Sequence, residues 1–469
     1  MIEVKNLRKA FNREELLKNL TNSLAQTYKN LRKCNTCGCY FSVNSDCACS
    51  KKNYDHAFVW IWLPNELHPV VAGKLTEHGQ GRLVFNYGKS YLERVNDECP
   101  AISIYEPELP LRAGVIENLK GLHIPGCIRD SSPDAWGRRV IINQLYGSKG
   151  ADTDTSNLSE LTYLLESGSD RIGALDFQLS PTEYIPRVSQ HVELDELISS
   201  AEKVEQGIPL TAELDRALFH GSSIGGARPK ALIQSNGKKY VAKFSSSTDL
   251  WSIVKAEFIA MRLAKHAGLN VANVHLVKAA HKDVLLVERF DRIAYENNWT
   301  RKIMVSALTL FELDDMFARY ASYERLAEII RYKFSQPKEE LKELFRRLVF
   351  NILCGNTDDH ARNHAAFWDG KYLSLTPAYD ICPQGRTGNE ASQAMLIYGS
   401  ENLSQLKLCL KAAKYCLLGD DEARDIINRL VMSIQSNWDK VCDEAELSSV
   451  DKNVLWEREF LNSFSMVGI

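Results

Sequence analysis

Apolar residues alternate with polar residues in short runs along the first part of the chain and recur every three or four positions along the last part. Alternation is typical of half-buried strands, whereas the longer repeat is typical of amphipathic helices. From residue 56 to about residue 113, the runs "AFVWIWL", "RLVFNYG" and "AISIYEP" predict short strands separated by Gly and Pro. The following segments predict a helix that starts at a proline, "RDSSPDAWGRRVIINQLYG", and another strand, "RIGALDFQL".

A different pattern begins at Gly221, where a Gly-rich stretch leads into two predicted strands joined by Asn236-Gly237, a strong hairpin signal. The next segment, "LWSIVKAEFIAMRLAKHAG", has a helical repeat of apolar residues and ends on Gly268, a typical helix stop. Two more strands follow in "HLVKAAHKDVLLVERFDR". After Arg292 the pattern is mostly helical, interrupted by one hairpin, "HAAFWDGKYLSLT". A strand-rich half followed by a helix-rich half predicts a two-lobed α+β fold.

The length of 469 residues predicts more than one domain. We assign residues 1–55 to an N-terminal extension, 56–290 to a strand-rich N-terminal lobe with the nucleotide-binding strands, and 291–469 to a helical C-terminal lobe. The 57 basic and 60 acidic residues give a net charge of -3, which argues against a protein whose whole surface binds a polyanion. No apolar run approaches the roughly 20 residues that span a bilayer, and the first residues lack a secretory signal. The sequence therefore predicts a soluble, cytoplasmic protein without a membrane partner.

The N-terminal extension combines a predicted helix over residues 12–33 with a cysteine-rich stretch, "CNTCGCYFSVNSDCACS". Four thiolates at this spacing could hold a tetrahedral Zn²⁺, and the most economical set is Cys34, Cys37, Cys47 and Cys49. Cys39 is a spare thiol, which leaves the assignment open. The alternative is a redox-labile or disordered linker. A zinc knuckle here could dock a protein partner, and nucleic acid is the less favoured ligand because the flanking basic patch is small.

A lysine and a glutamate in the second half of the N-terminal lobe suit the binding of phosphate groups. Lys243 ends the predicted strand "KKYVAKFSS", and alternation places it on the same face as the apolar Val241. Glu257 lies on the next helix, at the border of its apolar face. A strand lysine followed by a helix glutamate matches the ion pair of protein kinases. The alternative interpretation of Lys243 is a lysine at the surface edge of the sheet.

The acidic stretch "GNTDDHARNH" follows an apolar helix, and its spacing distinguishes its two aspartates. In protein kinases the catalytic aspartate and the metal-binding asparagine are five positions apart. The step from Asp358 to Asn363 has this length, whereas the step from Asp359 is one residue shorter. The hairpin that follows leads to "TPAYD", which ends on Asp380 and could complete a magnesium site. The alternative interpretations are an Asx-rich turn for the aspartates and a proline turn for "PAYD".

The segments "SSIGGARPKALI", "VAKF", "LLVERFDR", "NILCGNTDDHARNHA" and "LTPAYDICP" together resemble the HipA family of serine/threonine kinases, the toxins of HipBA-type toxin–antitoxin systems. Upstream, "SPDAWGRRVI" and "DRIGALDF" resemble that family's N-terminal subdomain. The resemblance spans residues 56–469 and implies an unusual two-lobed kinase fold that uses ATP and Mg²⁺. It also implies specific roles: Asp358 as the catalytic aspartate, Asn363 and Asp380 as Mg²⁺ ligands, Lys243 as the phosphate-binding lysine paired with Glu257, Glu288 to Phe290 as the adenine hinge, Gly225 and Gly226 in the phosphate loop, and Ser223 as the autophosphorylated serine that silences the enzyme.

The resemblance further implies a protein substrate, in the best-known case an aminoacyl-tRNA synthetase, and a helix-turn-helix antitoxin through which DNA is bound indirectly. The chain departs from the family pattern at Arg228-Pro229, where a Gln-Glu type pair is common, and in residues 1–55, which have no counterpart in the family pattern. Two other functions stay open from the sequence. One is a small-molecule phosphotransferase, and the other is a catalytically weak module that sequesters a partner.

Overall fold

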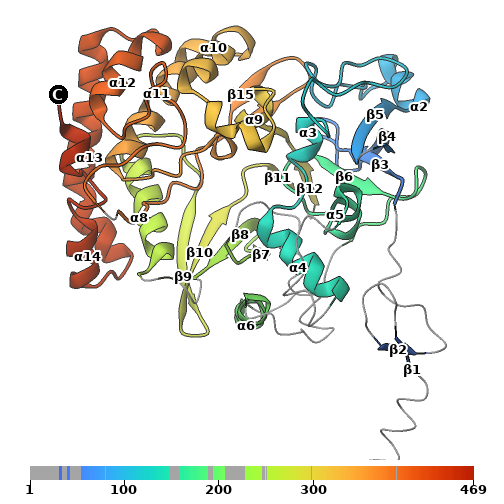
Figure 1. The fold of residues 1–469 in the computed structure, drawn as a ribbon, viewed down its shortest axis with the longest axis horizontal. Helices are drawn as coiled ribbons and strands as arrows, with labels where there is room; N and C mark the ends of the chain where they lie inside the picture. Colours follow the sequence, from blue (N-terminus) through green and yellow to red (C-terminus); the bar gives the residue numbers. More distant parts are fainter. Residues whose placement is uncertain are drawn as a thin grey trace, which may run out of the picture.

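The structure is a computed structural model, and it describes residues 31–33, 40–42, 54–79, 81–146, 158–187, 194–205, 228–245, 249, 251–296, 298–386 and 388–469. Within these ranges the chain forms a strand-rich part and a helical part. Figure 1 shows the N-terminal sheet on one side, the C-terminal helices on the other, and a second four-stranded sheet between them. The predicted α+β fold with a strand-rich and a helical lobe is confirmed.

The N-terminal sheet is antiparallel, with the strand order β5-β4-β3-β6. Its strands are β3 (His56–Ile61), β4 (Val70–His78), β5 (Arg82–Tyr87) and β6 (Leu175–Gln178). The chain between β5 and β6 contains the helical segments α2 (Lys89–Leu92), η2 (Arg94–Asn96), α3 (Gly126–Arg129), α4 (Ala135–Tyr146) and α5 (Glu160–Glu166). The predicted proline-started helix corresponds to α4. Because β6 joins the sheet at β3, these helices are part of one domain with the sheet.

The central sheet has the order β7-β8-β10-β9, and all its neighbours are antiparallel. It consists of β7 (Lys230–Ser235), β8 (Lys238–Phe244), β9 (Val274–Ala279) and β10 (Lys282–Glu288). Helix α8 (Ile253–His266) packs against β9 and β10. Side chains of β7, β8 and β10 form a separate small core with α4 and with α6 (Leu194–Glu205). The N-terminal domain therefore packs directly onto the central sheet through α4.

The C-terminal part is built from helices that pack against one another and against α8. The longer ones are α10 (Tyr323–Lys333), α11 (Pro337–Leu353), α12 (Leu406–Ala412), α13 (Asp420–Glu444) and α14 (Ser449–Leu455). Short helical segments are α9 (Ala307–Leu310), η6 (Asp315–Tyr320), η7 (Ala361–Asn363), η8 (Ala413–Cys416) and η9 (Ser463–Met466). A ribbon, β11 (Arg292–Tyr295) with β12 (Asn298–Arg301), leads to a small sheet of β13 (Ile303–Ser306), β14 (Ala365–Trp368) and β15 (Leu373–Leu375). The predicted hairpin is the β14–β15 pair.

Three local predictions were wrong. The part after Arg292 contains not one hairpin but two, because the β11–β12 ribbon precedes the β14–β15 pair. The run "AISIYEP" is not a strand, because side chains and not a strand ladder bind its backbone: Ile104 N donates to the Tyr87 hydroxyl at 2.9 Å, and Ser103 O accepts from Trp368 Nε1 at 2.9 Å. At the end of the helix predicted over residues 12–33, Leu31–Lys33 forms strand β1, which pairs with β2 (Tyr40–Ser42). Pairing with β2 satisfies backbone groups that the helix end would have left open. The rest of that predicted helix lies outside the described residues.

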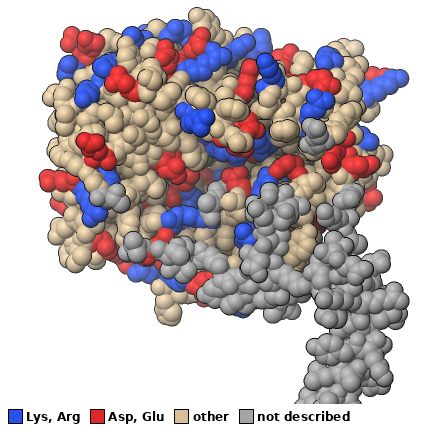
Figure 2. Space-filling view, viewed as in Figure 1, with Lys and Arg blue, Asp and Glu red and all other residues tan. Residues whose placement is uncertain are grey.

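Among the described residues, no helix is both long enough and apolar enough to cross a membrane. Acidic and basic side chains are interspersed over the face shown in Figure 2. This mixture agrees with the small net charge of the chain.

Candidate active site

Lys243 is the centre of a cluster of three charged side chains. It lies near the end of β8, and its Nζ contacts Glu257 Oε1 of α8 at 2.5 Å and Asp380 Oδ1 at 2.5 Å. Burial lowers the pKa of Lys243, but the two carboxylates outweigh burial and raise it above its ordinary value. Lys243 in turn lowers the pKa of Asp380 to about 2. The lysine therefore stays protonated, and the strand, the helix and the segment before Asp380 are joined at one point.

Asp380 has an unusual backbone conformation, with φ at +59°. Left-handed backbone is uncommon for residues other than glycine, although Asp tolerates it better than most. The preceding residues hold it in place, because Ala378 N donates to Asn270 O at 2.8 Å and Ala378 O accepts from Ala272 N at 2.9 Å. Outliers of this kind persist where the surroundings impose them, and they cluster at functional sites. Its carboxylate is less buried than that of Glu257, with 42% against 6% of the side chain exposed.

The acidic loop (residues 355–364) holds its two aspartates in opposite environments. Asp359 is buried, and its carboxylate accepts hydrogen bonds from the Tyr323 hydroxyl and, at 2.8 Å, from His364 Nε2. Asp358 is exposed. Partial enclosure raises the pKa of Asp358, His360 opposes this rise, and the carboxylates of Asp380 and Asp359 add to it. Asp359 thus supports the loop from within, while Asp358 faces solvent near Asp380.

Asn363 lies at the end of the same loop, in η7. Its Nδ2 donates to Asp358 O at 3.1 Å, which leaves its amide oxygen as an acceptor. The second carboxylate oxygen of Asp380 is likewise not engaged by Lys243. Mg²⁺ prefers carboxylate and amide oxygens combined with water and substrate phosphates. Asn363 and Asp380 therefore fit the donor set of a magnesium site, with Asp358 beside them.

The end of β10 carries the predicted adenine hinge. Glu288 N donates to Asn273 O at 2.8 Å and Arg289 N donates to Lys239 O at 2.8 Å, so these two N–H groups are occupied. The N–H of Phe290 makes no hydrogen bond with any residue that the structure describes. The Phe290 ring packs on Tyr379, with ring centroids 5.6 Å apart. The hinge segment is thus in contact with the residue that precedes Asp380.

A group of buried charges, which we call the hinge cluster, lies directly behind this segment. Asp291 Oδ2 contacts both Arg289 and Arg292 at 2.7 Å, and Asp170 Oδ1 contacts the same two arginines at 3.0 Å. The arginines also donate to the backbone carbonyls of Arg171 and Gly173. Burial raises the pKa of Asp291, but Arg289 and Arg292 lower it to about 2. The hinge cluster (Asp170, Arg289, Asp291 and Arg292) joins the N-terminal domain to the end of β10.

Lys230 was not singled out from the sequence, yet it pairs with Lys243 in the β7–β8 register. Burial and the neighbouring Lys243 lower the pKa of Lys230 to about 8. A signal for it was present: the two-residue turn Asn236-Gly237 has both residues at positive φ, which sets the register that places Lys230 opposite Lys243. The site therefore has two neighbouring lysines where one was predicted.

Several predicted site residues lie outside the described residues. They are Ser223, Gly225 and Gly226 of the Gly-rich stretch and the cysteines Cys34, Cys37, Cys47 and Cys49. Among the residues that the structure does describe, no cluster of three or more His, Cys, Asp or Glu side chains could hold a metal ion.

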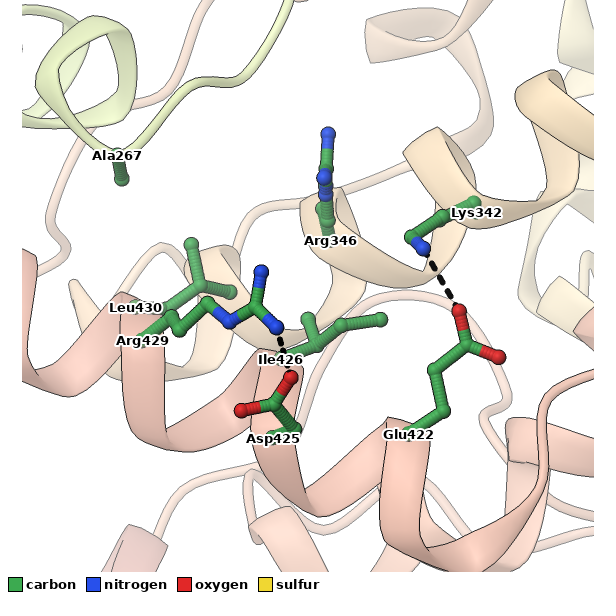
Figure 3. A pocket seen from close by; sticks show the side chains of 8 residues that line it. All are labelled: Ala267, Lys342, Arg346, Glu422, Asp425, Ile426, Arg429 and Leu430. Atoms are coloured by element: carbon green, nitrogen blue, oxygen red, sulfur yellow. Dashed lines mark hydrogen bonds and ion pairs between the residues drawn. The ribbon is translucent and has the colours of Figure 1, made fainter.

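Figure 3 shows a small hollow that is lined by residues of α11 and α13 and by Ala267 at the end of α8. Its lining is largely charged, and Lys342 pairs with Glu422 at 2.7 Å across it. None of the predicted site residues lines this hollow. The Lys342–Glu422 ion pair is therefore separate from the ion pairs of the candidate active site.

The fold and the site together define a two-lobed, kinase-like protein with its charged centre between the lobes. The family model described as HipA N-terminal domain matches residues 65–178, and the one described as HipA-like C-terminal domain matches residues 222–438. Together they span about seven-tenths of the 469 residues, and the chain belongs to the HipA family.

A relative and a solved structure agree with this membership. The serine/threonine-protein kinase toxin HipA of Shewanella oneidensis is 28% identical over 277 residues, which cover 53% of this chain and 60% of that protein. A solved complex of Shewanella oneidensis HipA, HipB and operator DNA matches with a TM-score of 0.61 and 21% identity, and covers 88% of this chain and 100% of that one. At this identity the structural match supports the fold alone.

Proposed function

We propose that this protein is an ATP- and Mg²⁺-dependent serine/threonine protein kinase. The observation that carries the proposal is the contact of Lys243 with both Glu257 and Asp380, next to the exposed Asp358. Phosphoryl transfer requires a lysine on the phosphates, oxygen ligands for Mg²⁺, and a carboxylate that receives the proton of the attacking hydroxyl. The described part of the site offers a candidate for each.

The roles follow from the environments of these side chains. Lys243, held by Glu257, binds the phosphates of ATP, and Lys230 adds a second positive charge beside it. Asn363 and Asp380 would hold Mg²⁺, which would supply positive charge to neutralise the transferred phosphoryl group. Asp358 accepts the proton of the substrate hydroxyl, and its raised pKa suits a general base better than the depressed pKa of Asp380 does. The adenine binds at Glu288 to Phe290, where the N–H of Phe290 is available.

We further propose that the protein acts as a growth-inhibiting toxin on a translation-related protein. Family membership and the name of the Shewanella relative support this role. The solved HipA–HipB–DNA complex supports a helix-turn-helix antitoxin as partner, with DNA bound through it.

Autophosphorylation of Ser223 would silence the kinase, and Cys34, Cys37, Cys47 and Cys49 would bind Zn²⁺. Zinc content of the purified protein, compared with a Cys34→Ser/Cys37→Ser variant, tests the last point.

The decisive experiment is incubation of the purified protein with labelled ATP and Mg²⁺, with and without candidate substrate proteins. We expect label on Ser223 and on an added protein, and none with Asp358→Ala. Absence of label together with absence of ATP binding by calorimetry would overturn the proposal. Transfer to a metabolite and not to protein would instead show a small-molecule phosphotransferase. Full toxicity of Asp358→Ala in cells would show that the protein acts by sequestering a partner.

A further inference from the structure

The guanidinium of Arg362, in the acidic loop, is held between two carboxylates from different parts of the chain. Its Nη1 contacts Asp134 Oδ1 at 2.9 Å, and its Nη2 contacts Asp315 Oδ1 at 2.8 Å. Asp134 immediately precedes α4 of the N-terminal domain, whereas Asp315 begins η6 in the C-terminal part. Burial lowers the pKa of Arg362, but Asp134 and Asp315 raise it above its ordinary value. With two carboxylates on it, Arg362 is compensated in charge and is poorly suited to bind phosphate itself.

The backbone of Arg362 belongs to the same arrangement as the metal ligands. Its carbonyl accepts a hydrogen bond from the Tyr379 hydroxyl at 2.7 Å, and Tyr379 directly precedes Asp380. Asn363 is the next residue after Arg362. Arg362 therefore joins two contacts in one residue: its side chain binds Asp134, and its carbonyl ties the acidic loop to the segment before Asp380.

The segment around Asp134 also contacts the strand that carries Lys230. Trp136 Nε1 donates to Lys230 O at 3.0 Å, in a buried contact, and Asp134 raises the pKa of Lys230 against the effect of burial. The same segment is fixed to the C-terminal part, because Asp130 accepts from Ser306 N at 2.6 Å and from Ser306 Oγ at 2.8 Å. Residues 130–136 of the N-terminal domain thus contact both β7, which carries Lys230, and the acidic loop.

We propose that Asp134 is a positioning residue for phosphoryl transfer, so that the N-terminal domain forms a working part of the active site. By holding Arg362 while its neighbour Trp136 holds Lys230, it fixes the acidic loop at a set distance from the bound phosphates. This inference rests on the proposed kinase function. Misplacement of reacting groups by about 1 Å can reduce a rate about a hundredfold without loss of binding, so the effect belongs in kcat.

The test compares Asp134→Asn with the wild type and with two controls. Asp134→Asn keeps the size of the side chain and removes its charge. Asp315→Asn removes the other, more exposed carboxylate from the same guanidinium, and Glu422→Gln breaks the Lys342 ion pair of Figure 3, which involves no residue of the site. We expect Asp134→Asn to lower kcat about tenfold or more, while the KM and Kd for ATP change less than about threefold. Asp315→Asn should lower kcat less, and Glu422→Gln should leave kcat unchanged.

Further measurements separate positioning from a loss of folding. Asp134→Glu, which keeps the carboxylate, should recover part of kcat, and Asp134→Asn combined with Arg362→Gln should cost little more than either change alone. Amide exchange in residues 355–364 should rise in Asp134→Asn while exchange in β8 and β10 stays unchanged. This readout needs no activity, so it tests the contact even if the wild type transfers no phosphate and the proposed function fails. Unchanged kcat in Asp134→Asn, or a loss that only follows the unfolded fraction, would overturn the inference.

Discussion

Two groups of charged side chains in this molecule differ in how fully their members pair with one another. In the hinge cluster, Asp291 is shared by Arg289 and Arg292, each 1% exposed, and further donors go to backbone carbonyls. In the candidate active site, Lys243 holds Glu257 and Asp380, but Asp380 stays 42% exposed and Asp358 has no cation in direct contact among the described residues. The charged groups of the hinge cluster pair with one another and with nearby backbone carbonyls, whereas the site has carboxylate oxygens that accept no hydrogen bond from the described residues.

This difference separates structural charges from functional ones. A buried ion pair contributes little to stability unless its geometry is excellent and its remaining hydrogen bonds are made. The hinge cluster meets that condition and joins two domains. The candidate active site does not meet this condition, and its backbone is strained at Asp380. Its carboxylates are therefore better explained as groups that bind a ligand. Perturbed pKa values occur in both groups, so the pKa alone would not distinguish them.

The largest effect is expected for Asp358→Asn, which removes a proton acceptor and leaves the size of the side chain unchanged. Because Asp358 is exposed, the free energy of unfolding should stay within about 0.5 kcal/mol of wild type. The rate of phosphate transfer should fall by about 10²- to 10⁴-fold, the usual contribution of a general base. Initial rates with labelled ATP and a urea titration measure both. A large loss of stability in this variant would place Asp358 among the structural charges.

The opposite outcome is expected for Asp291→Asn in the hinge cluster. The change removes one of the two carboxylates that Arg289 and Arg292 share and leaves both buried guanidinium groups with Asp170 alone, which should cost about 3–5 kcal/mol of unfolding free energy. The pKa of Asp291 is lowered to about 2 in the folded state, so its contribution is present above the unfolded value of about 3.9 and is lost as the pH falls toward 2. Urea titrations across that range should therefore show a steeper acid loss for the wild type than for the variant. Parallel curves would contradict this account.

Contacts between residues close in the sequence could be predicted from it, whereas contacts between distant residues could not. Strand alternation and helical spacing singled out Lys243 and Glu257, which the structure brings into contact. The Asn236-Gly237 turn sets the register that pairs Lys230 with Lys243, but Lys230 was not singled out from the sequence. The contact between Asp134 and Arg362 joins residues 228 positions apart and has no local periodicity. It depends on how α4 packs onto the central sheet, which no pattern within either segment determines. The same holds for the pairing of Asp170 with the arginines of the hinge cluster.

The twin aspartates provide a smaller and more local test. Asp359→Asn removes a charged acceptor from the buried Tyr323 and His364, which should cost about 1–3 kcal/mol of unfolding free energy. Activity measured below the lowered melting temperature should remain within about tenfold of wild type, because Asp359 supports the loop and touches no reacting group. Parallel assays of Asp358→Asn and Asp359→Asn at one temperature make this comparison. If Asp359→Asn lost transfer and Asp358→Asn kept it, the assignment of the two residues would be reversed.

The smallest expected effect concerns Lys230 and pH. Its folded pKa is lowered to about 8, mainly by burial, so it carries its charge at neutral pH and loses it as the pH rises through 8. Loss of one cation beside the phosphates should weaken ATP binding progressively above that pH, by about tenfold per unit at most. In Lys230→Arg the guanidinium stays charged over the whole range, so its ATP affinity should be flat between pH 7 and 9.5. Calorimetric titrations of both proteins measure this, and the same decline in both would mean that Lys243 or the nucleotide, and not Lys230, sets the pH dependence.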